Sequence, residues 1–326
     1  MIISKLSEEI RGKGVRIVFT EGWDKRVMGA AVRLANEGIL NPVLLGEREE
    51  IEACAKENGF DISNIECIAP SEYPEEEREA MITKMVELRR GKMSREAVAE
   101  AISHTNYFGT MLVKMGLADG LLGGATYSTA DTVRPALQLV KTAPGQSIVS
   151  STFILVKGSE QLFMADCAIN RDPNPDELVE IAIQTAATAK KFGVDPKVAM
   201  LSYSSFGSAT GHCVAKMNEA TTRLKRMPLD FDVDGEMQFD CAVAPEVAAL
   251  KAPESKVAGK ANTFIFPNLS SGNIGYKIAA RLGGWEAVGP VLQGLNAPIN
   301  DLSRGCNEEE IYKMAIVTGA QKALGI

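Results

Sequence analysis

The stretch Asn296–Ile311 gathers several side chains that can do chemistry. It contains the hydroxyl of Ser303, the guanidinium of Arg304, the thiol of Cys306 and the carboxylate of Glu310. A hydroxyl can donate to a developing oxyanion, a guanidinium matches phosphate oxygens in two-point contacts, and a carboxylate can accept a proton. Together these groups suit a reaction on an anionic substrate.

This stretch is predicted to connect a strand to a helix. It follows an apolar run that ends at Leu295 and precedes a helical pattern over Ile311–Leu324. Such connections hold the ligands of many α/β proteins, and the helix N-terminus adds unpaired N–H groups that suit an anion. A purely structural interpretation is also open, because Asn307 and Glu310 have the spacing of an N-cap and its N3 partner. Glu310 is therefore either a chemical group or part of a helix cap.

The composition argues against several classes of protein. The chain has 326 residues, of which 45% are hydrophobic and 24% charged, and its net charge is −7. A nucleic-acid-binding protein usually presents a basic face, which nothing in this acidic sequence indicates. Six scattered cysteines without a C-x-x-C pair argue against a disulfide framework or a zinc site, and only two histidines make a histidine-rich metal site unexpected. We expect reduced thiols and a cytoplasmic protein, in which an anionic ligand needs cations gathered locally.

No segment predicts a membrane protein. Residues 1–14 mix charged and apolar side chains, which indicates an amphipathic helix and not a signal peptide. The chain has no apolar run of about 18 residues, the length needed to span a bilayer. We therefore expect no membrane partner.

Short apolar runs alternate with helical patterns in the first part of the chain. Strands are expected at Val15–Thr20, Pro42–Gly46, Ile65–Pro70 and Gly120–Leu122. Helices are expected at Asp24–Asn36, Ile51–Asn58, Tyr73–Lys92 and Thr105–Leu117, with another that begins near Ser94 as its N-cap. This alternation with short connections predicts an α/β fold with a parallel sheet covered on both faces.

The pattern changes near Thr142–Gln146, which we take as a domain boundary. Two β-rich runs follow, Ser147–Val156 and Gln161–Ile169, and their spacing predicts an antiparallel hairpin. Alternation then resumes, with helices expected at Pro175–Phe192, Gly211–Lys225, Phe239–Leu250 and Gly272–Leu282 and strands at Val198–Tyr203 and Thr263–Phe266. We expect the final helix to return to the first domain, which would comprise residues 1–143 and 294–326, with residues 144–293 as the second domain.

Three further loops are rich in small and hydroxylated residues. They are Gly123–Thr129, Ser204–Gly211 and Pro267–Asn273, each after a predicted strand. Small residues let backbone N–H groups approach phosphate oxygens closely. The chain has no G-x-G-x-x-G after its first strand, no G-x-x-x-x-G-K-[ST] and no G-x-S-x-G. What remains is an α/β protein that handles phosphate or another anion.

Arginines could supply the cations for such an anion. Besides Arg304, the candidates are Arg89, Arg90 and Arg134. Arg89 and Arg90 could also form only a solvated helix end. Arg134 lies in the mostly apolar stretch Val133–Val140, where a structural explanation is harder to find.

Four segments of the chain resemble the phosphate acetyltransferase (phosphotransacetylase) family. They are residues 123–138, 234–240, 266–273 and 289–306, and the last one, with its Asn-Asp-Leu-Ser-Arg-Gly-Cys run, is specific. The likeness covers essentially the whole chain, at the length of the short form of the phosphate acetyl/butyryltransferase family. It implies two α/β/α sandwich domains with a cleft between them, similar to isocitrate and isopropylmalate dehydrogenases.

The resemblance also implies an activity. Members of this family interconvert acetyl-CoA and phosphate with acetyl phosphate and coenzyme A. They use coenzyme A as a substrate and need no redox cofactor, and we expect no metal among the site residues. The resemblance further implies a cytoplasmic homodimer that is paired functionally with acetate kinase.

Particular residues match positions with roles in the family. Ser303 and Arg304 match its catalytic Ser-Arg pair, and Glu310 stands where the family has a proposed aspartate base. Arg134 and Arg89 match arginines tied to coenzyme A. The candidates for substrate or coenzyme A binding from the loops are Ser128, Thr129, Ser270, Gly272 and Asn273.

The mechanism implied is direct transfer of the acetyl group. Glu310 would take the proton of the coenzyme A thiol, and the thiolate would attack acetyl phosphate while Ser303 and Arg304 balance the developing charges. An acyl-enzyme on Cys306 is a less favoured route. The alternatives for the whole chain are a phosphate butyryltransferase and a non-catalytic protein that binds coenzyme A or acyl phosphate.

Overall fold

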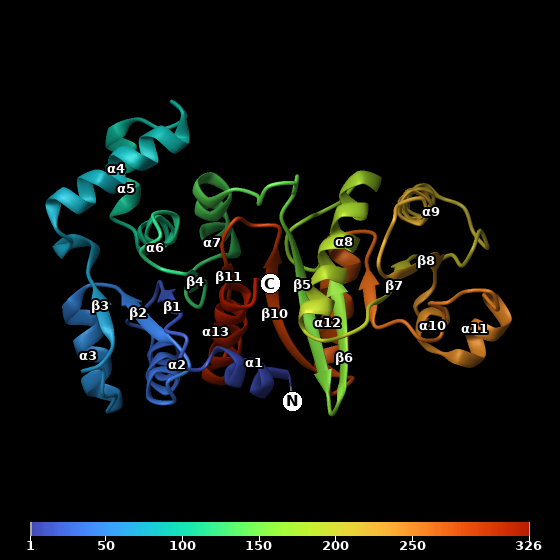
Figure 1. The fold of residues 1–326 in the computed structure, drawn as a ribbon, viewed down its shortest axis with the longest axis horizontal. Helices are drawn as coiled ribbons and strands as arrows, with labels where there is room; N and C mark the ends of the chain where they lie inside the picture. Colours follow the sequence, from blue (N-terminus) through green and yellow to red (C-terminus); the bar gives the residue numbers. More distant parts are fainter. Residues whose placement is uncertain (1, 326) are drawn as a thin grey trace. The chain divides into compact units, whose positions relative to one another are not determined.

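The computed structural model describes residues 2–325, which divide into two compact units (Figure 1). The first unit runs to Pro144 and resumes at Leu295, and the second is Gly145–Gly294. Among the helices within residues 2–325, none has both the length and the apolar character needed to cross a membrane.

The first unit is built on a five-stranded sheet in which all strands are parallel. Its strands are β1 (Arg16–Phe19), β2 (Asn41–Leu45), β3 (Glu66–Ile68), β4 (Gly120–Gly123) and β11 (Ile299–Asp301). Their order across the sheet is β11-β4-β1-β2-β3. The predicted parallel sheet is confirmed for this unit, whereas strand β11 lies in a stretch that was expected to be a connection only.

The strand order places a topological switch point beside β1. The chain passes from β1 to β2 and β3 on one side and then returns to place β4 on the other side of β1. In open α/β sheets, ligands bind outside the carboxyl ends of the strands at such a switch point. The loops that follow β1, β4 and β11 therefore merit attention.

Helices cover both faces of the first sheet. The helical segments of this unit are α1 (Ile2–Ile10), α2 (Lys25–Asn36), α3 (Arg48–Asn58), α4 (Glu75–Arg89), α5 (Arg95–Ile102), α6 (Thr105–Lys114), α7 (Thr129–Pro135) and α13 (Glu308–Ala323), with 3₁₀ and π turns at Pro70–Glu72 and Ala136–Val140. Helices α2 and α13 pack on one face, and α1 packs against α13. The final helix thus lies in the first unit, as expected.

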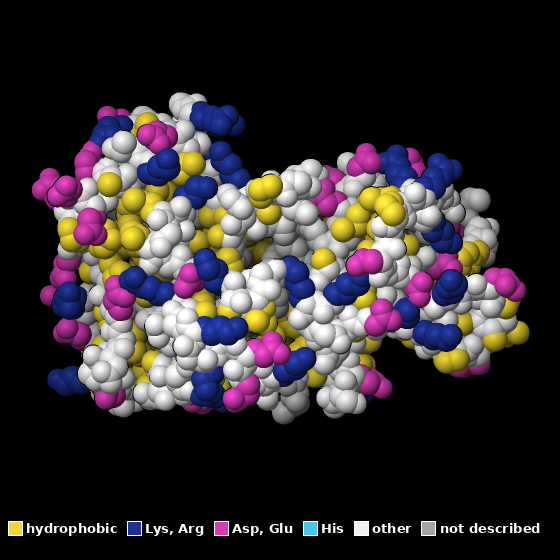
Figure 2. Space-filling model, in the orientation of Figure 1, with side chains coloured by type: hydrophobic (Ala, Val, Ile, Leu, Met, Phe, Trp, Pro, Cys, Tyr) yellow, Lys and Arg dark blue, Asp and Glu magenta, His cyan; other side chains and the backbone are white. Residues whose placement is uncertain are grey.

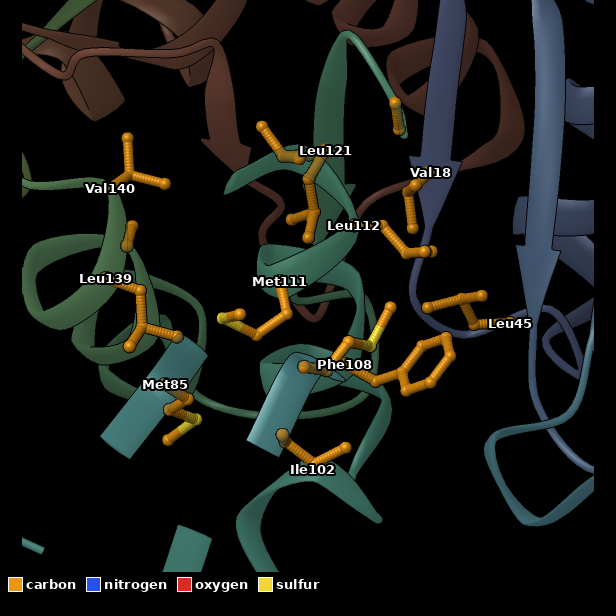
Figure 3. Close-up of a cluster of buried hydrophobic side chains, with 14 of the residues drawn as sticks. Val18, Leu45, Met85, Ile102, Phe108, Met111, Leu112, Leu121, Leu139 and Val140 are labelled. Atoms are coloured by element: carbon orange, nitrogen blue, oxygen red, sulfur yellow. The ribbon is translucent and has the colours of Figure 1, made fainter. Parts of the chain in front are cut away.

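The opposite face carries an apolar cluster of its own. Figure 3 shows Val18, Leu45 and Leu121 of the strands beside Phe108 and Met111 of α6. Residues of α4, α5 and the π turn complete this cluster. Because side chains alternate along a strand, one set of strand residues reaches this cluster while the other faces α2 and α13.

The second unit contains a mixed six-stranded sheet. Its strands are β5 (Ser150–Lys157), β6 (Glu160–Ala165), β7 (Lys197–Leu201), β8 (Asp232–Met237), β9 (Thr263–Ile265) and β10 (Glu286–Gln293), in the order β10-β5-β6-β9-β7-β8. The predicted antiparallel hairpin of β5 and β6 is confirmed. Strand β10 adds a second antiparallel pair at the edge, and the remaining pairs are parallel.

Five helices accompany this sheet, and three of them correct the prediction. They are α8 (Pro175–Lys191), α9 (His212–Lys225), α10 (Phe239–Val243), α11 (Pro245–Lys251) and α12 (Leu269–Arg281). The single helix expected at Phe239–Leu250 is wrong, because Ala244 is extended with φ −100° and ψ 111° before Pro245. Helix α12 begins at Leu269 instead of Gly272, since Asn268 caps it by accepting from Ser271 N.

Candidate active site

Three loops meet at the carboxyl end of the parallel sheet. They follow β1 (residues 20–24), β4 (124–128) and β11 (302–307). The amide of Leu302 donates to Gly123 O at 2.7 Å. The buried Glu21 carboxylate accepts from Gly124 N at 3.0 Å and from Thr126 N at 2.6 Å. Hydrogen bonds from the backbone and from the buried Glu21 therefore connect these loops at the carboxyl end of the sheet.

The loop after β11 presents Ser303 and Arg304 to solvent. It closes in a turn in which Cys306 N donates to Ser303 O at 2.9 Å. Gly305 N lies 3.4 Å from Ser303 Oγ, which accepts a weak hydrogen bond. Both Ser303 and Arg304 are exposed, and no carboxylate within residues 2–325 forms an ion pair with Arg304. The loop thus offers a hydroxyl beside an unneutralised guanidinium.

Glu310 forms the predicted capping box with Asn307. Its Oε2 accepts from Asn307 N at 3.1 Å, and Asn307 Oδ1 accepts from Glu310 N at 2.9 Å. Within the described part of the chain, the other carboxylate oxygen of Glu310 has no hydrogen bond. One oxygen therefore serves the helix cap while the second stays open to a substrate.

Cys306 lies in the same loop but is turned away from solvent. Its side chain is buried, with 5% exposure. Burial raises the pKa of its thiol to about 11, although the charge of Arg26 opposes this shift. Since the thiolate is the nucleophilic form, Cys306 is a poor nucleophile near neutral pH.

Two buried acids at the carboxyl end of the sheet, Asp301 and Glu21, were not among the predicted site residues. Asp301, at the end of β11, is 2% exposed, and its Oδ2 accepts from the Thr129 hydroxyl at 2.6 Å. Burial raises the pKa of Asp301 to about 6, and the charge of Glu21 adds to this effect. Burial also raises the pKa of Glu21, against the hydrogen bonds from Thr126 and Gly124. For Glu21 the available signal was its position directly after the predicted strand Val15–Thr20, whereas no predicted strand marked Asp301.

Among the predicted binding residues, Ser128 and Thr129 have structural partners. Ser128 is the N-cap of α7, and its hydroxyl donates to Asp131 Oδ2 at 2.7 Å. The Thr129 hydroxyl is the donor to Asp301. Arg134 is freer, because its side chain is 57% exposed and lies 3.7 Å from Asp131 in a loose ion pair. Of these three, Arg134 is the best placed to contact a ligand.

Arg89 is the last residue of α4, where a left-handed Arg90 with φ 49° ends the helix. The Nε atom of Arg89 is buried and has no hydrogen-bond partner among the described residues. Figure 2 shows Lys and Arg side chains gathered near the turn between α4 and α5, while both signs are interspersed over the rest of the face shown. A buried donor without a partner is costly, which favours an acceptor from a ligand.

The remaining predicted binding residues lie in the second unit. Ser270, Gly272 and Asn273 occupy the first turns of α12 and not a loop. Asn273 Nδ2 donates to Cys167 O at 3.1 Å, and a Cβ on Gly272 would overlap Asp166 O. Gly272 and Asn273 therefore have packing roles, while Ser270 is exposed.

The structure thus brings together only part of the predicted set. Thr129 meets the loop of Ser303, Arg304 and Glu310 at the edge of the first sheet, since its hydroxyl bonds to Asp301 two residues before Ser303. Arg89 lies at the end of α4 in the same unit. Within residues 2–325, no group of His, Cys, Asp and Glu side chains could hold a metal ion.

Comparison with known proteins identifies the family of this chain. The family described as phosphate acetyl/butaryl transferase matches residues 1–319. A phosphate acetyltransferase of Bacillus subtilis (strain 168) is 50% identical over 320 residues, which cover 98% of this chain and 98% of the relative.

Solved structures agree as well. A phosphotransacetylase from Streptococcus pyogenes is 52% identical, with a TM-score of 0.94 over 100% of this chain and 98% of its own. A branched-chain phosphotransacylase from Enterococcus faecalis V583 is 18% identical and shares the fold, with a TM-score of 0.71 over 94% of this chain and 99% of its own. The chain therefore belongs to the phosphate acetyl/butaryl transferase family, and it is a transferase.

Proposed function

We propose that the chain interconverts acetyl-CoA and phosphate with acetyl phosphate and coenzyme A. The observation that carries this proposal is the exposed Ser303–Arg304 pair, whose guanidinium no carboxylate within residues 2–325 neutralises. Two anionic substrates need such a cation in a protein of net charge −7. The 50% identity to a full-length relative named phosphate acetyltransferase supports the acetyl group as the one transferred.

The reaction begins with a proton transfer. A free thiol has a pKa of about 8.5, so a base is needed to form the thiolate of coenzyme A at neutral pH. The carboxylate oxygen of Glu310 that does not cap α13 can take this proton. The thiolate then attacks the carbonyl carbon of acetyl phosphate, and a C–S bond forms.

Ser303 and Arg304 act on the charges that this attack creates. The Ser303 hydroxyl donates to the oxyanion, a contact whose loss typically costs about 10²–10³ in rate. Arg304 binds the phosphoryl oxygens and stabilises phosphate as the C–O bond breaks. The proton on Glu310 leaves with the products, and acetyl-CoA is released.

The buried state of Cys306 supports direct transfer over an acyl-enzyme. An acyl-enzyme needs a thiolate within reach of the substrate, yet this thiol is 5% exposed and burial raises its pKa to about 11. The thiol of coenzyme A meets neither obstacle. We therefore assign the nucleophile to coenzyme A.

Coenzyme A binding is assigned to Arg89 and Arg134. The buried Nε of Arg89 lacks an acceptor in the described structure, and Arg134 is largely exposed. Both can pair with the phosphates of coenzyme A. The candidates Ser128, Thr129, Ser270, Gly272 and Asn273 remain secondary, because four of them already have structural partners.

Several wider properties of this protein are predicted only from its resemblance to the family. They are two domains of the isocitrate and isopropylmalate dehydrogenase type with a cleft between them, a homodimer, functional pairing with acetate kinase and a cytoplasmic location. The absence of a permanently bound cofactor is a prediction of the same kind.

A direct assay tests the proposed reaction. Purified protein is mixed with acetyl phosphate and coenzyme A, and thioester formation is followed by ultraviolet absorbance, with butyryl phosphate run in parallel. Rapid formation of acetyl-CoA with little activity on butyryl phosphate is the expected result. Preference for butyryl phosphate would keep the mechanism and change the substrate, and no turnover of either would overturn the proposal.

A further inference from the structure

Arg26 lies in the first turn of α2, a position that does not suit a cation. Asp24 is the N-cap of this helix, and the first turn contains no acidic residue. The N-terminal end of a helix carries a partial positive charge, so a guanidinium there is repelled. When a residue type is unfavourable at its position in a helix, as this cation is, it often has a compensating role elsewhere in the fold.

All five N–H donors of the Arg26 guanidinium have acceptors. Two of them serve Asp24, with Nε 3.0 Å from Oδ1 and Nη2 2.8 Å from Oδ2. Burial raises the pKa of Asp24, but the hydrogen bonds from Arg26 outweigh it and hold this pKa below its usual range. Asp24 is therefore an ionised partner that fixes the plane of the guanidinium.

The other three donors reach carbonyl groups of two neighbouring loops. Nη2 donates to Ala125 O at 3.0 Å, in the loop after β4. Nη1 donates to Arg304 O at 3.0 Å and to Cys306 O at 2.8 Å, on both sides of Gly305 in the loop after β11. One side chain thus joins the three loops at the carboxyl edge of the sheet.

The segment that follows this loop is held separately. Arg33, also on α2, donates to Glu309 Oε2 at 2.6 Å and stacks on Tyr312 with its guanidinium carbon 3.7 Å from the ring centroid. The Tyr312 hydroxyl donates to Glu37 Oε2 at 2.6 Å.

Before the loop, Leu302 N donates to Gly123 O. Between these two anchors, the contacts of Arg26 restrain the carbonyls of Arg304 and Cys306, which belong to the turn Ser303–Cys306.

We propose that Arg26 is a positioning residue that holds the turn carrying Ser303 and Arg304 in its reactive geometry. This proposal rests on the proposed function of that turn. Because backbone carbonyls and Asp24 occupy all donors of Arg26, its effect passes through the loop. A lysine cannot replace it, because an ammonium presents three donors from one atom and cannot bridge three separated carbonyls.

The test compares Arg26→Lys, Arg26→Ala and the control Arg48→Ala. Arg48 is an exposed arginine of the same unit, paired with Glu72. In the acetyl phosphate and coenzyme A assay, Arg26→Ala should lower kcat by about 10²-fold, the scale of a catalytic group displaced by about 1 Å, while KM for coenzyme A stays within about twofold. Arg26→Lys should recover less than about a tenth of the lost kcat, and Arg48→Ala should match the parent.

A second measurement does not depend on activity. The rate at which N-ethylmaleimide labels Cys306 is followed by peptide mass spectrometry, because this buried thiol becomes accessible when its loop opens. In Arg26→Ala the rate should rise about 10-fold or more. Labelling of Cys54, buried in the same unit, should not change, which separates loop opening from unfolding.

The outcomes distinguish this proposal from the proposed function. Rescue by lysine, or a raised KM for coenzyme A with unchanged kcat, would mean that Arg26 acts by its charge on a ligand and would overturn the positioning role. So would a lowered kcat with unchanged Cys306 labelling. A parent protein with no acyl transfer would defeat the proposed function, while the labelling experiment would still decide whether Arg26 holds the loop.

Discussion

The Thr129 hydroxyl donates to Asp301 Oδ2 at 2.6 Å, across the gap between the loop after β4 and the end of β11. Asp301 is 2% exposed, and its Oδ1 has no partner among the described residues. Asp301 lies two residues before Ser303 in the sequence, at the end of β11, so its charge is buried close to the proposed site along the chain. The hydrogen bond from Thr129 offsets only part of the cost of burying that charge.

This cost makes a prediction about pH. Burial raises the pKa of Asp301 to about 6, above the value of about 3.9 in an unfolded chain. The folded protein therefore binds more protons than the unfolded one between about pH 4 and 6, and stability falls as the pH rises through this range. The contribution from Asp301 is about 2–3 kcal/mol, fully present below about pH 4 and lost above about pH 6.

The variant Asp301→Asn tests this prediction. This side chain cannot ionise. The free energy of unfolding of the variant minus that of the parent should therefore increase by about 2 kcal/mol between pH 4 and pH 7. Thermal unfolding at several pH values measures the difference. A parallel pH dependence of parent and variant would show that Asp301 does not titrate in this range.

Thr129 should matter through its hydroxyl alone. The variant Thr129→Val removes the hydroxyl that donates to Oδ2 of the buried Asp301 carboxylate, which we expect to cost about 1–3 kcal/mol at pH 8, where Asp301 is ionised. Thr129→Ser keeps the donor and is the matched control. Equal melting temperatures for the Val and Ser variants would contradict the assigned hydrogen bond.

Gly272 should behave as a packing residue. A Cβ at this position would overlap the backbone oxygen of Asp166, and backbone cannot move aside cheaply. Gly272→Ala is therefore expected to destabilise the second unit by about 1–3 kcal/mol, whereas the exposed neighbour Ser270→Ala should stay within about 0.5 kcal/mol of the parent. If Gly272→Ala unfolds like the parent but binds coenzyme A poorly, the residue belongs to the ligand site instead.

The parallel sheet of the first unit could be predicted because its first four strands are local apolar runs. Strands β8 and β11 could not, because they are short or polar. Asn300 in β11 is buried, and its Nδ2 donates to Thr318 Oγ1 at 2.8 Å. In β8, the buried Glu236 accepts from Asn218 Nδ2 at 2.9 Å. Partners distant in the sequence make these polar strands stable, and no local pattern reveals them.

The candidate site divides in the same way. Ser303, Arg304 and the cap of Glu310 follow from residue types within one short stretch. Arg26 and Asp301 were missed, because their contacts exist only once the loops after β1, β4 and β11 meet. Ser128 was predicted as a binding residue because helix caps and phosphate-binding loops use the same small polar residues. In the structure its hydroxyl donates to Asp131.

The role of the thiol in the turn that carries Ser303 and Arg304 can be tested by Cys306→Ala. Direct transfer does not use this thiol, so kcat should remain within about threefold of the parent, the loss reflecting only a small change in packing. An acyl-enzyme route predicts instead the loss of nearly all turnover. Single-turnover experiments with acetyl phosphate alone add a check, because acetylated Cys306 detected by peptide mass spectrometry would favour the acyl-enzyme.

The two possible roles of Glu310 can be separated with a pair of variants. Glu310→Gln keeps an N3 side chain that can cap α13 but removes the base, so kcat should fall by about 10²–10⁴-fold with little change in melting temperature. Asn307→Ala removes the N-cap and keeps the carboxylate, so it should cost about 1 kcal/mol of stability and leave kcat within a few-fold. The opposite pattern, a destabilised Gln variant with normal kcat, would assign Glu310 to the cap alone and leave coenzyme A without a base in this loop.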